Sequence, residues 1–181
     1  MGCAVIAKIF IVIALLVAAV LIAAAFKPNT FRIQRSIGIQ APPEKIFPLL
    51  DDLHNWSRWE AQDREDPTVQ RTFSGPASGS GAASEWSSTG KAGRGRMLIT
   101  ESEPPARVLV VVDFTKPFQA HNFNEFVLEP RGAETQLTWT WTMQGRILYL
   151  MKVMGLFVNV DKAMGRHFEA GLRNLKTIAE Q

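Results

Sequence analysis

The sequence has very little cysteine and histidine. Its single cysteine is Cys3, so the rest of the 181-residue chain has neither a disulfide framework nor a cysteine-based metal site. The three histidines are His54, His121 and His167, and none is spaced from another histidine or a carboxylate as metal ligands are. We therefore predict no metal centre and no cofactor.

Clustered charge and catalytic motifs are also missing. The chain has 20 Lys and Arg against 17 Asp and Glu, a formal net charge of +3, with no block of like charges. Such a weak, dispersed excess argues against a nucleic-acid partner. No Gly-x-Ser-x-Gly, His-Glu-x-x-His or phosphate-loop pattern occurs. The sequence leaves open whether the protein is an enzyme, and the absence of a catalytic motif favours a non-enzyme.

One long apolar run stands at the N-terminus. No polar side chain occurs from Ile9 to Phe26. A helix of this length spans a hydrocarbon core of ~30 Å, and Lys8 can extend its amine to the interface. The prediction is a single-pass membrane protein, in which residues 1–27 form a transmembrane anchor and residues 28–181 form one domain.

Two features of the anchor stay open. Ala23, Ala24 and Ala25 resemble the small residues at a signal-peptide cleavage site, so a cleaved leader is the alternative. The side of the membrane is unresolved. The basic residues after the run favour a cytoplasmic domain, whereas Lys8 and the short N-terminal tail favour an exterior one.

The rest of the chain reads as one strand, two short helices, about six strands and a long helix. Residues 31–40 alternate between apolar and polar. Helices are expected at residues 43–50 and 53–59, and further strands at residues 69–73, 84–89, 94–101, 108–114, 121–128 and 135–143. A helical stripe runs from Met164 to Ala179. This order predicts an α+β fold in which a curved antiparallel sheet packs against the C-terminal helix. A sheet that curls around this helix without filling the gap leaves a cavity.

Several motifs resemble those of a known superfamily. They are Arg35-Ser36-Ile37, Ala41-Pro42-Pro43-Glu44-Lys45-Ile46-Phe47, Asn55-Trp56 with Trp59, Gly81 with Trp86, Gly95-Arg96-Met97 with Ile99, Pro117-Phe118, Thr135 with Leu137 and Trp139, and Gly171-Leu172 with Asn174-Leu175-Lys176. Residues 31–180 thus resemble the SRPBCC superfamily of START-like, helix-grip proteins, and most closely its polyketide cyclase/dehydrase-like branch. The resemblance implies about seven strands around the long C-terminal helix and a hydrophobic pocket between them. It says little about function, since one fold hosts many functions.

The apolar faces of three strands and of the long helix supply the candidate ligand-binding residues. Flat aromatic walls with an indole N–H suit a small-molecule pocket. Ordinary core packing is the alternative for each residue. The candidates are Val110, Val112, Phe126, Leu128, Trp139, Trp141, Met143, Met164 and Phe168. Trp56 and Trp59 are expected in the core or at the pocket rim.

Several polar residues near these faces are further candidates. Arg35 has the parity of Ile33 and Ile37, so it is a candidate inward anchor for an anionic group. Asp113 and Glu125 are either a facing acid/base pair or an exposed hairpin pair. His167 either borders the cavity or lies on the outer flank of the helix.

Asn122 and Asn124 have the parity of Phe126 and Leu128. We expect both amides at the solvated end of their strand. On a buried face they would need partners, such as a ligand, water or each other. The apolar segment Ile147–Val160 is either packed on the sheet, a lid over the pocket or a membrane contact.

Three functions follow. The first is a membrane-anchored binding domain for a lipid or other hydrophobic small molecule, with no nucleic-acid partner and an unknown protein partner. The second is a cyclase- or dehydratase-type enzyme that uses the same pocket with Arg35, Asp113, Glu125 or His167. The third is a membrane-tethered scaffold for a protein partner, which a filled cavity would favour.

Overall fold

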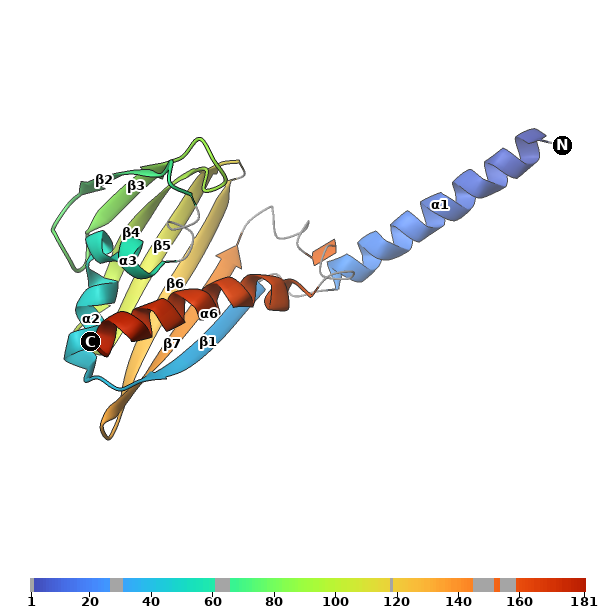
Figure 1. The fold of residues 1–181 in the computed structure, drawn as a ribbon. Coiled ribbons are helices and arrows are strands. Elements are labelled where there is room, and N and C mark those ends of the chain that lie inside the picture. Colours follow the sequence, from blue (N-terminus) through green and yellow to red (C-terminus); the bar gives the residue numbers. More distant parts are fainter. Residues whose placement is uncertain (1, 27–30, 61–65, 118, 145–151, 154–158) are drawn as a thin grey trace.

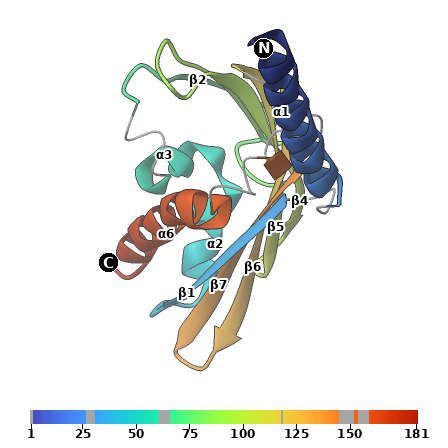
Figure 2. The same cartoon turned by 90° about the vertical axis from the view of Figure 1, so that its right-hand side faces the viewer.

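The structure is a computed structural model, and it describes residues 2–26, 31–60, 66–117, 119–144, 152–153 and 159–181. A helical N-terminal segment is followed by a sheet with helices on one face (Figures 1 and 2). The helices are α1 (Gly2–Ala25), α2 (Pro43–Asp51), the short η1 (Leu53–Asn55), α3 (Trp56–Trp59) and α6 (Val160–Ala179). The strands are β1 (Phe31–Ile39), β2 (Gln70–Ser74), β3 (Ala83–Ser87), β4 (Arg94–Glu103), β5 (Arg107–Lys116), β6 (Ala120–Arg131) and β7 (Glu134–Gln144).

The seven strands form one antiparallel sheet in the order β1-β7-β6-β5-β4-β3-β2. Strands β2 to β7 follow one another as hairpins, and the last strand, β7, pairs with the first, β1. Alternation in β7 explains its two faces. Leu137, Trp139, Trp141 and Met143 are buried, while Gln136, Thr138 and Thr142 are partly exposed on the other side. The buried face carries α2, α3 and α6 (Figure 2).

Two tryptophans join α3 to the end of α2. The indole N–H of Trp56 donates to the carbonyl of Leu50 at 2.9 Å, and that of Trp59 donates to the carbonyl of Leu49 at 2.9 Å. The last carbonyls of a helix have no partner within it, so these bonds satisfy two groups that burial would otherwise leave unpaired. The short helices are thereby fixed above the sheet, with Trp59 in the core and Trp56 at the edge of a cavity.

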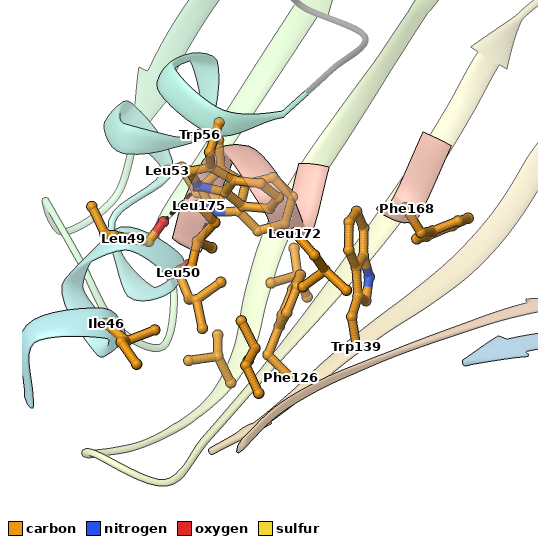
Figure 3. Close-up of a cluster of buried hydrophobic side chains, with 14 of the residues drawn as sticks. Ile46, Leu49, Leu50, Leu53, Trp56, Phe126, Trp139, Phe168, Leu172 and Leu175 are labelled. Atoms are coloured by element: carbon orange, nitrogen blue, oxygen red, sulfur yellow. Dashed lines mark hydrogen bonds between the residues drawn. The ribbon is translucent and has the colours of Figure 1, made fainter. Parts of the chain in front are cut away.

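The core lies between the sheet and α6. Leu172 and Leu175 from α6 meet Phe126 and Trp139 from the sheet and Leu50 from α2 (Figure 3). Every residue of this buried cluster belongs to the part of the chain from Ile33 to Ala179. No residue of α1 belongs to this cluster, although Ala24 of α1 is also buried.

The fold expected from the sequence is confirmed: seven antiparallel strands, two short helical segments after β1 and a long C-terminal helix. Within α1, residues Lys8–Ala25 are long and apolar enough to cross a membrane, a test that a signal sequence also passes. Most of the large apolar side chains described in α1 are exposed. The segment Ile147–Val160 lies almost wholly outside the described residues.

Candidate functional site

A cavity of about 480 Å³ lies between the sheet and the first half of α6. The sheet contributes the inward side chains of β4 to β7, and α6 contributes three residues. Trp56 of α3 and one residue from each of three connecting segments complete the wall. The lining residues are Trp56, Glu60, Lys91, Met97, Val112, Phe114, Pro117, Ala120, Asn122, Asn124, Trp139, Trp141, Met143, Met164, His167 and Phe168. The volume is that of a small-molecule site, and most of the lining is apolar.

Aromatic rings form the inner wall of the cavity. The ring of Phe168 on α6 lies 4.4 Å from that of Trp139, centroid to centroid, in an edge-to-face arrangement. Trp141 lies 6.1 Å from the same ring, and Trp59 lies 5.7 Å from Trp139. Figure 3 shows Trp139 and Phe168 side by side at the edge of the core. Such pairs hold one another in place, so this wall is preformed.

The cavity lies at the end of the domain nearest to α1. Met143, which lines it, is the Cα partner of Phe31, the first residue of β1. Met164 contributes from the first turns of α6. Five Cα–Cα steps separate Phe26 from Phe31, so the apolar helix ends within about 19 Å of the start of β1. Figure 1 shows α1 leaving the domain at this end.

Six of the expected ligand-wall residues line the cavity: Val112, Trp139, Trp141, Met143, Met164 and Phe168. Val110, Phe126 and Leu128 do not. They are buried further along β5 and β6, where α2 and α3 pack directly over the sheet. The parity of a strand shows which face a residue occupies, but it does not show where along the strand the helices leave space.

Arg35 faces α6, as its parity indicates, but it does not line the cavity. Its Nη2 lies 2.9 Å from Asp161 Oδ2 and its Nε lies 3.0 Å from Glu169 Oε1. These hydrogen bonds, chiefly the one to Asp161, raise the pKa of Arg35. Two carboxylates of α6 thus already neutralise the guanidinium. Arg35 connects β1 to α6 through these two ion pairs.

Asp113 and Glu125 do not face each other, so the acid/base pair considered above is wrong. In the β5–β6 register the partner of Asp113 is His121, and the partner of Glu125 is Leu109. Asp113 and His121 form an exposed pair, and Arg107 Nε donates to Glu125 Oε1 at 2.8 Å. Each carboxylate is engaged on the hairpin, away from the cavity.

The expected solvated position of Asn122 and Asn124 is also wrong. The two residues are only 1% and 5% exposed, and both line the cavity. The reason is that β6 begins at Ala120 and pairs on both sides, with β5 and with β7. Asn124 Oδ1 accepts a hydrogen bond from Trp139 Nε1 at 2.9 Å, which fixes the indole in the wall.

A histidine and a carboxylate meet at the cavity. His167 on α6 places its Nε2 2.8 Å from Oε1 of Glu60, the residue after α3, and both line the cavity. Sequence reasoning left the position of His167 open and missed Glu60. No local pattern identifies Glu60, because the two residues meet only when α3 packs against α6.

The loop that carries Lys91 to the cavity is held by Asp66. This carboxylate accepts hydrogen bonds from Ser88 Oγ at 2.6 Å, from Thr68 Oγ1 at 2.6 Å and from the backbone N–H of Ala92 at 3.0 Å. These bonds, chiefly the one from Ser88, lower the pKa of Asp66 well below its usual range. The network orders the turn between β3 and β4 and so fixes one side of the cavity wall.

The fold and the cavity together define a helix-grip protein with a preformed apolar pocket. The family model described as polyketide cyclase/dehydrase and lipid transport matches residues 30–180. The chain belongs to this family, as its resemblance in sequence predicted. A search of the curated proteins finds no match.

Solved structures share the fold at low sequence identity. A protein from Chromobacterium violaceum is 14% identical with a TM-score of 0.57, and the match covers 86% of this chain and 99% of the other. For the Aha1 dimer from Colwellia psychrerythraea the identity is 20%, the TM-score 0.57 and the coverage 83% and 96%. A hypothetical protein from Helicobacter pylori is 10% identical with a TM-score of 0.61, and the match covers 82% of this chain and 88% of the other. At such identities the matches show the fold alone.

Proposed function

We propose that this protein is a membrane-anchored binding domain that holds a lipid or another hydrophobic small molecule in the cavity between the sheet and α6. The observation that carries the proposal is the cavity of about 480 Å³ with its aromatic and methionine-rich wall. Apolar surface of this kind gains free energy when it contacts an apolar ligand instead of water. The family description, which includes lipid transport, supports the same class of ligand.

The position of the cavity supports a membrane role. Its lining includes Met143 and Met164, at the end of the domain from which the chain continues to α1. If α1 crosses a bilayer, the short connection keeps this end of the domain at the membrane surface. A ligand of low solubility then needs to travel only a short distance between the bilayer and the cavity. A cavity filled by side chains would favour the scaffold alternative, and this cavity is open.

Adjacent valines on β5 provide a matched test of the binding site. Val112 lines the cavity, whereas Val111 is on the other face of the same strand. Residues 28–181 would be purified as wild type, Val112→Trp and Val111→Trp, and each would be analysed by native mass spectrometry with extraction of apolar compounds. We expect a defined adduct on the wild type and on Val111→Trp, and its loss from Val112→Trp.

Two results would contradict the proposal. One is a wild type that stays free of adduct even after incubation with a mixture of membrane lipids. The other is an adduct that survives in Val112→Trp, since the ligand would then be bound elsewhere. Thermal unfolding of all three proteins controls for a change in folding.

The Glu60–His167 pair favours one second candidate, an enzyme of the cyclase or dehydratase type. A histidine held 2.8 Å from a carboxylate has the arrangement of a general base with its orienting partner. The extracted compound, incubated with fresh protein, separates the two functions. Binding alone leaves its mass and retention unchanged, whereas an enzyme converts it, and His167→Gln abolishes the conversion while adduct formation persists.

A further inference from the structure

Two neighbouring turns at one end of the sheet carry cations and no acidic residue. The β3–β4 turn holds Lys91 and leads into Arg94, and β5 ends at Lys116. Arg94 and Lys116 are Cα partners, so the two turns lie next to each other. The sequence has no Asp or Glu in residues 86–100 or 114–124. Lys91, Arg94 and Lys116 thus form a basic rim, and all three are exposed.

The acidic residues around the basic rim already have other partners. Asp66 accepts its hydrogen bonds from the β3–β4 turn and from Thr68. Asp113 pairs with His121 across the β5–β6 hairpin, and Glu85 is the ion-pair partner of Arg96. Among the described residues, no carboxylate forms an ion pair with any of the three rim cations. Their charge is therefore available to a partner outside the domain.

The turns at the opposite end of the sheet are different. Arg107, after the β4–β5 turn, pairs with three glutamates of β4 and β6. Arg131, before the β6–β7 turn, pairs with Glu129. The β2–β3 turn, residues 75–82, has no charged residue. Of the turns that the structure describes in this sheet, only those of the basic rim present cations without a carboxylate partner.

The basic rim lies at the end of the sheet from which the chain continues to α1 (Figure 1). A row of Cα partners crosses the sheet from Phe31 in β1 to Val112 in β5 and Met97 in β4. Lys116 is four residues beyond this row, and a strand advances about 3.3 Å per residue, so it lies about 13 Å further out. The connection from α1 to Phe31 spans at most about 19 Å. The rim can therefore reach the surface of a membrane that α1 crosses.

The basic rim also borders the cavity. Lys91 itself lines the cavity, and so does Pro117, the exposed residue that follows Lys116. A surface that binds the rim therefore also lies against this side of the cavity.

We infer that the basic rim docks on the headgroups of an anionic lipid bilayer and holds this side of the cavity against the membrane surface. The inference rests on the membrane anchorage in the proposed function, and it adds the face of the domain that meets the bilayer and the charge of the lipid. Anionic headgroups attract Lys and Arg side chains that lie within a Debye length, about 10 Å, of the surface. Because α1 tethers the domain, docking is intramolecular, so three cations act at a high effective concentration of lipid.

Lysine footprinting of the full chain tests the inference. The protein would be reconstituted in nanodiscs of phosphatidylcholine alone, or of phosphatidylcholine and phosphatidylglycerol in equal parts. Neither lipid has a primary amine, so an uncharged amine-reactive reagent leaves the lipids unmodified. Mass spectrometry gives the modification rates of Lys91 and Lys116 relative to that of Lys45, an exposed lysine of α2 in the same molecule. The quantity of interest is the change in these relative rates between the two kinds of disc.

We expect Lys91 and Lys116 to react at least about fivefold more slowly in the anionic discs, the factor that one cation near an anionic surface supplies. High salt should abolish the difference, because it screens the attraction. Arg94→Glu should also abolish it, and Lys116→Glu should do so at Lys91. Arg173→Glu, at an exposed arginine in the second half of α6, is the matched control and should keep the wild-type difference.

Three results would overturn the inference. The first is equal relative rates in the two kinds of disc. The second is a slowing that persists in both Arg94→Glu and Lys116→Glu. The third is a slowing that Arg173→Glu abolishes as fully as Arg94→Glu, since the attraction would then depend on the overall charge of the domain. None of these results depends on a ligand, so the binding function keeps its separate test with Val112→Trp.

Discussion

Replacing Asn124 with leucine should destabilise the domain through Trp139. The indole N–H of Trp139 is a donor that only Asn124 satisfies, across 2.9 Å in a buried position. Leucine keeps the size of the side chain and removes the acceptor, so the indole N–H is left buried and unpaired. Such a group costs about 1–3 kcal/mol. We expect a loss of this size in the free energy of unfolding of residues 28–181, measured by urea titration with circular dichroism.

A double-mutant cycle shows whether the loss arises from this hydrogen bond. Trp139→Phe removes the N–H and retains an aromatic ring, so Asn124→Leu should cost about 1 kcal/mol less in the Trp139→Phe background than in wild type. If the two changes are additive within about 0.5 kcal/mol, the hydrogen bond contributes nothing and the reasoning is refuted. If the cycle shows coupling, the wall of the cavity is held by a polar contact as well as by packing.

Two further predictions concern the stability of the frame around the cavity. Leu172→Ala, at a fully buried position of α6 against the sheet, should cost about 2–5 kcal/mol in urea unfolding, and a loss below 1 kcal/mol would contradict its place in the core. Because the pKa of Asp66 is lowered in the folded state, its network stabilises the fold above the unfolded-state pKa of about 3.9, and this stabilisation is lost as the pH falls below that value. The stability difference between wild type and Asp66→Asn should therefore be constant from pH 7 to pH 5 and shrink towards pH 3, and a difference that is the same at pH 7 and pH 3 would contradict the role of the carboxylate.

Local pattern was sufficient to predict the frame of this protein. The period-two alternation of β1 and β7 and the stripe of Phe168, Leu172 and Leu175 on α6 reflect a buried face, and burial is what determines these elements. The strand boundaries shifted by a few residues where alternation continues into polar residues. At the start of β6 the shift is one residue, and Asn122 is buried there because β5 and β7 both extend far enough to pair with it.

The site was harder to predict because it depends on contacts between distant elements. Val110 and Val112 have the same parity, yet only Val112 lines the cavity, because the packing of the helices over the sheet decides where space remains. Glu60 and His167 are far apart in sequence and meet through the packing of α3 on α6. Arg35 has the predicted orientation, but its partners Asp161 and Glu169 on α6 became visible only in the structure.

Photocrosslinking in the membrane tests the central claim most directly. The full chain would be expressed in cells, and membranes that contain it would be incubated with a long-chain fatty probe that carries a diazirine. After irradiation, the crosslinked peptides would be mapped by mass spectrometry. The account predicts crosslinks at the cavity, in peptides that contain Trp141, Met143 or Met164, which persist in Val111→Trp and disappear in Val112→Trp. Crosslinks confined to α1, or cavity crosslinks of equal yield in the two variants, would contradict it.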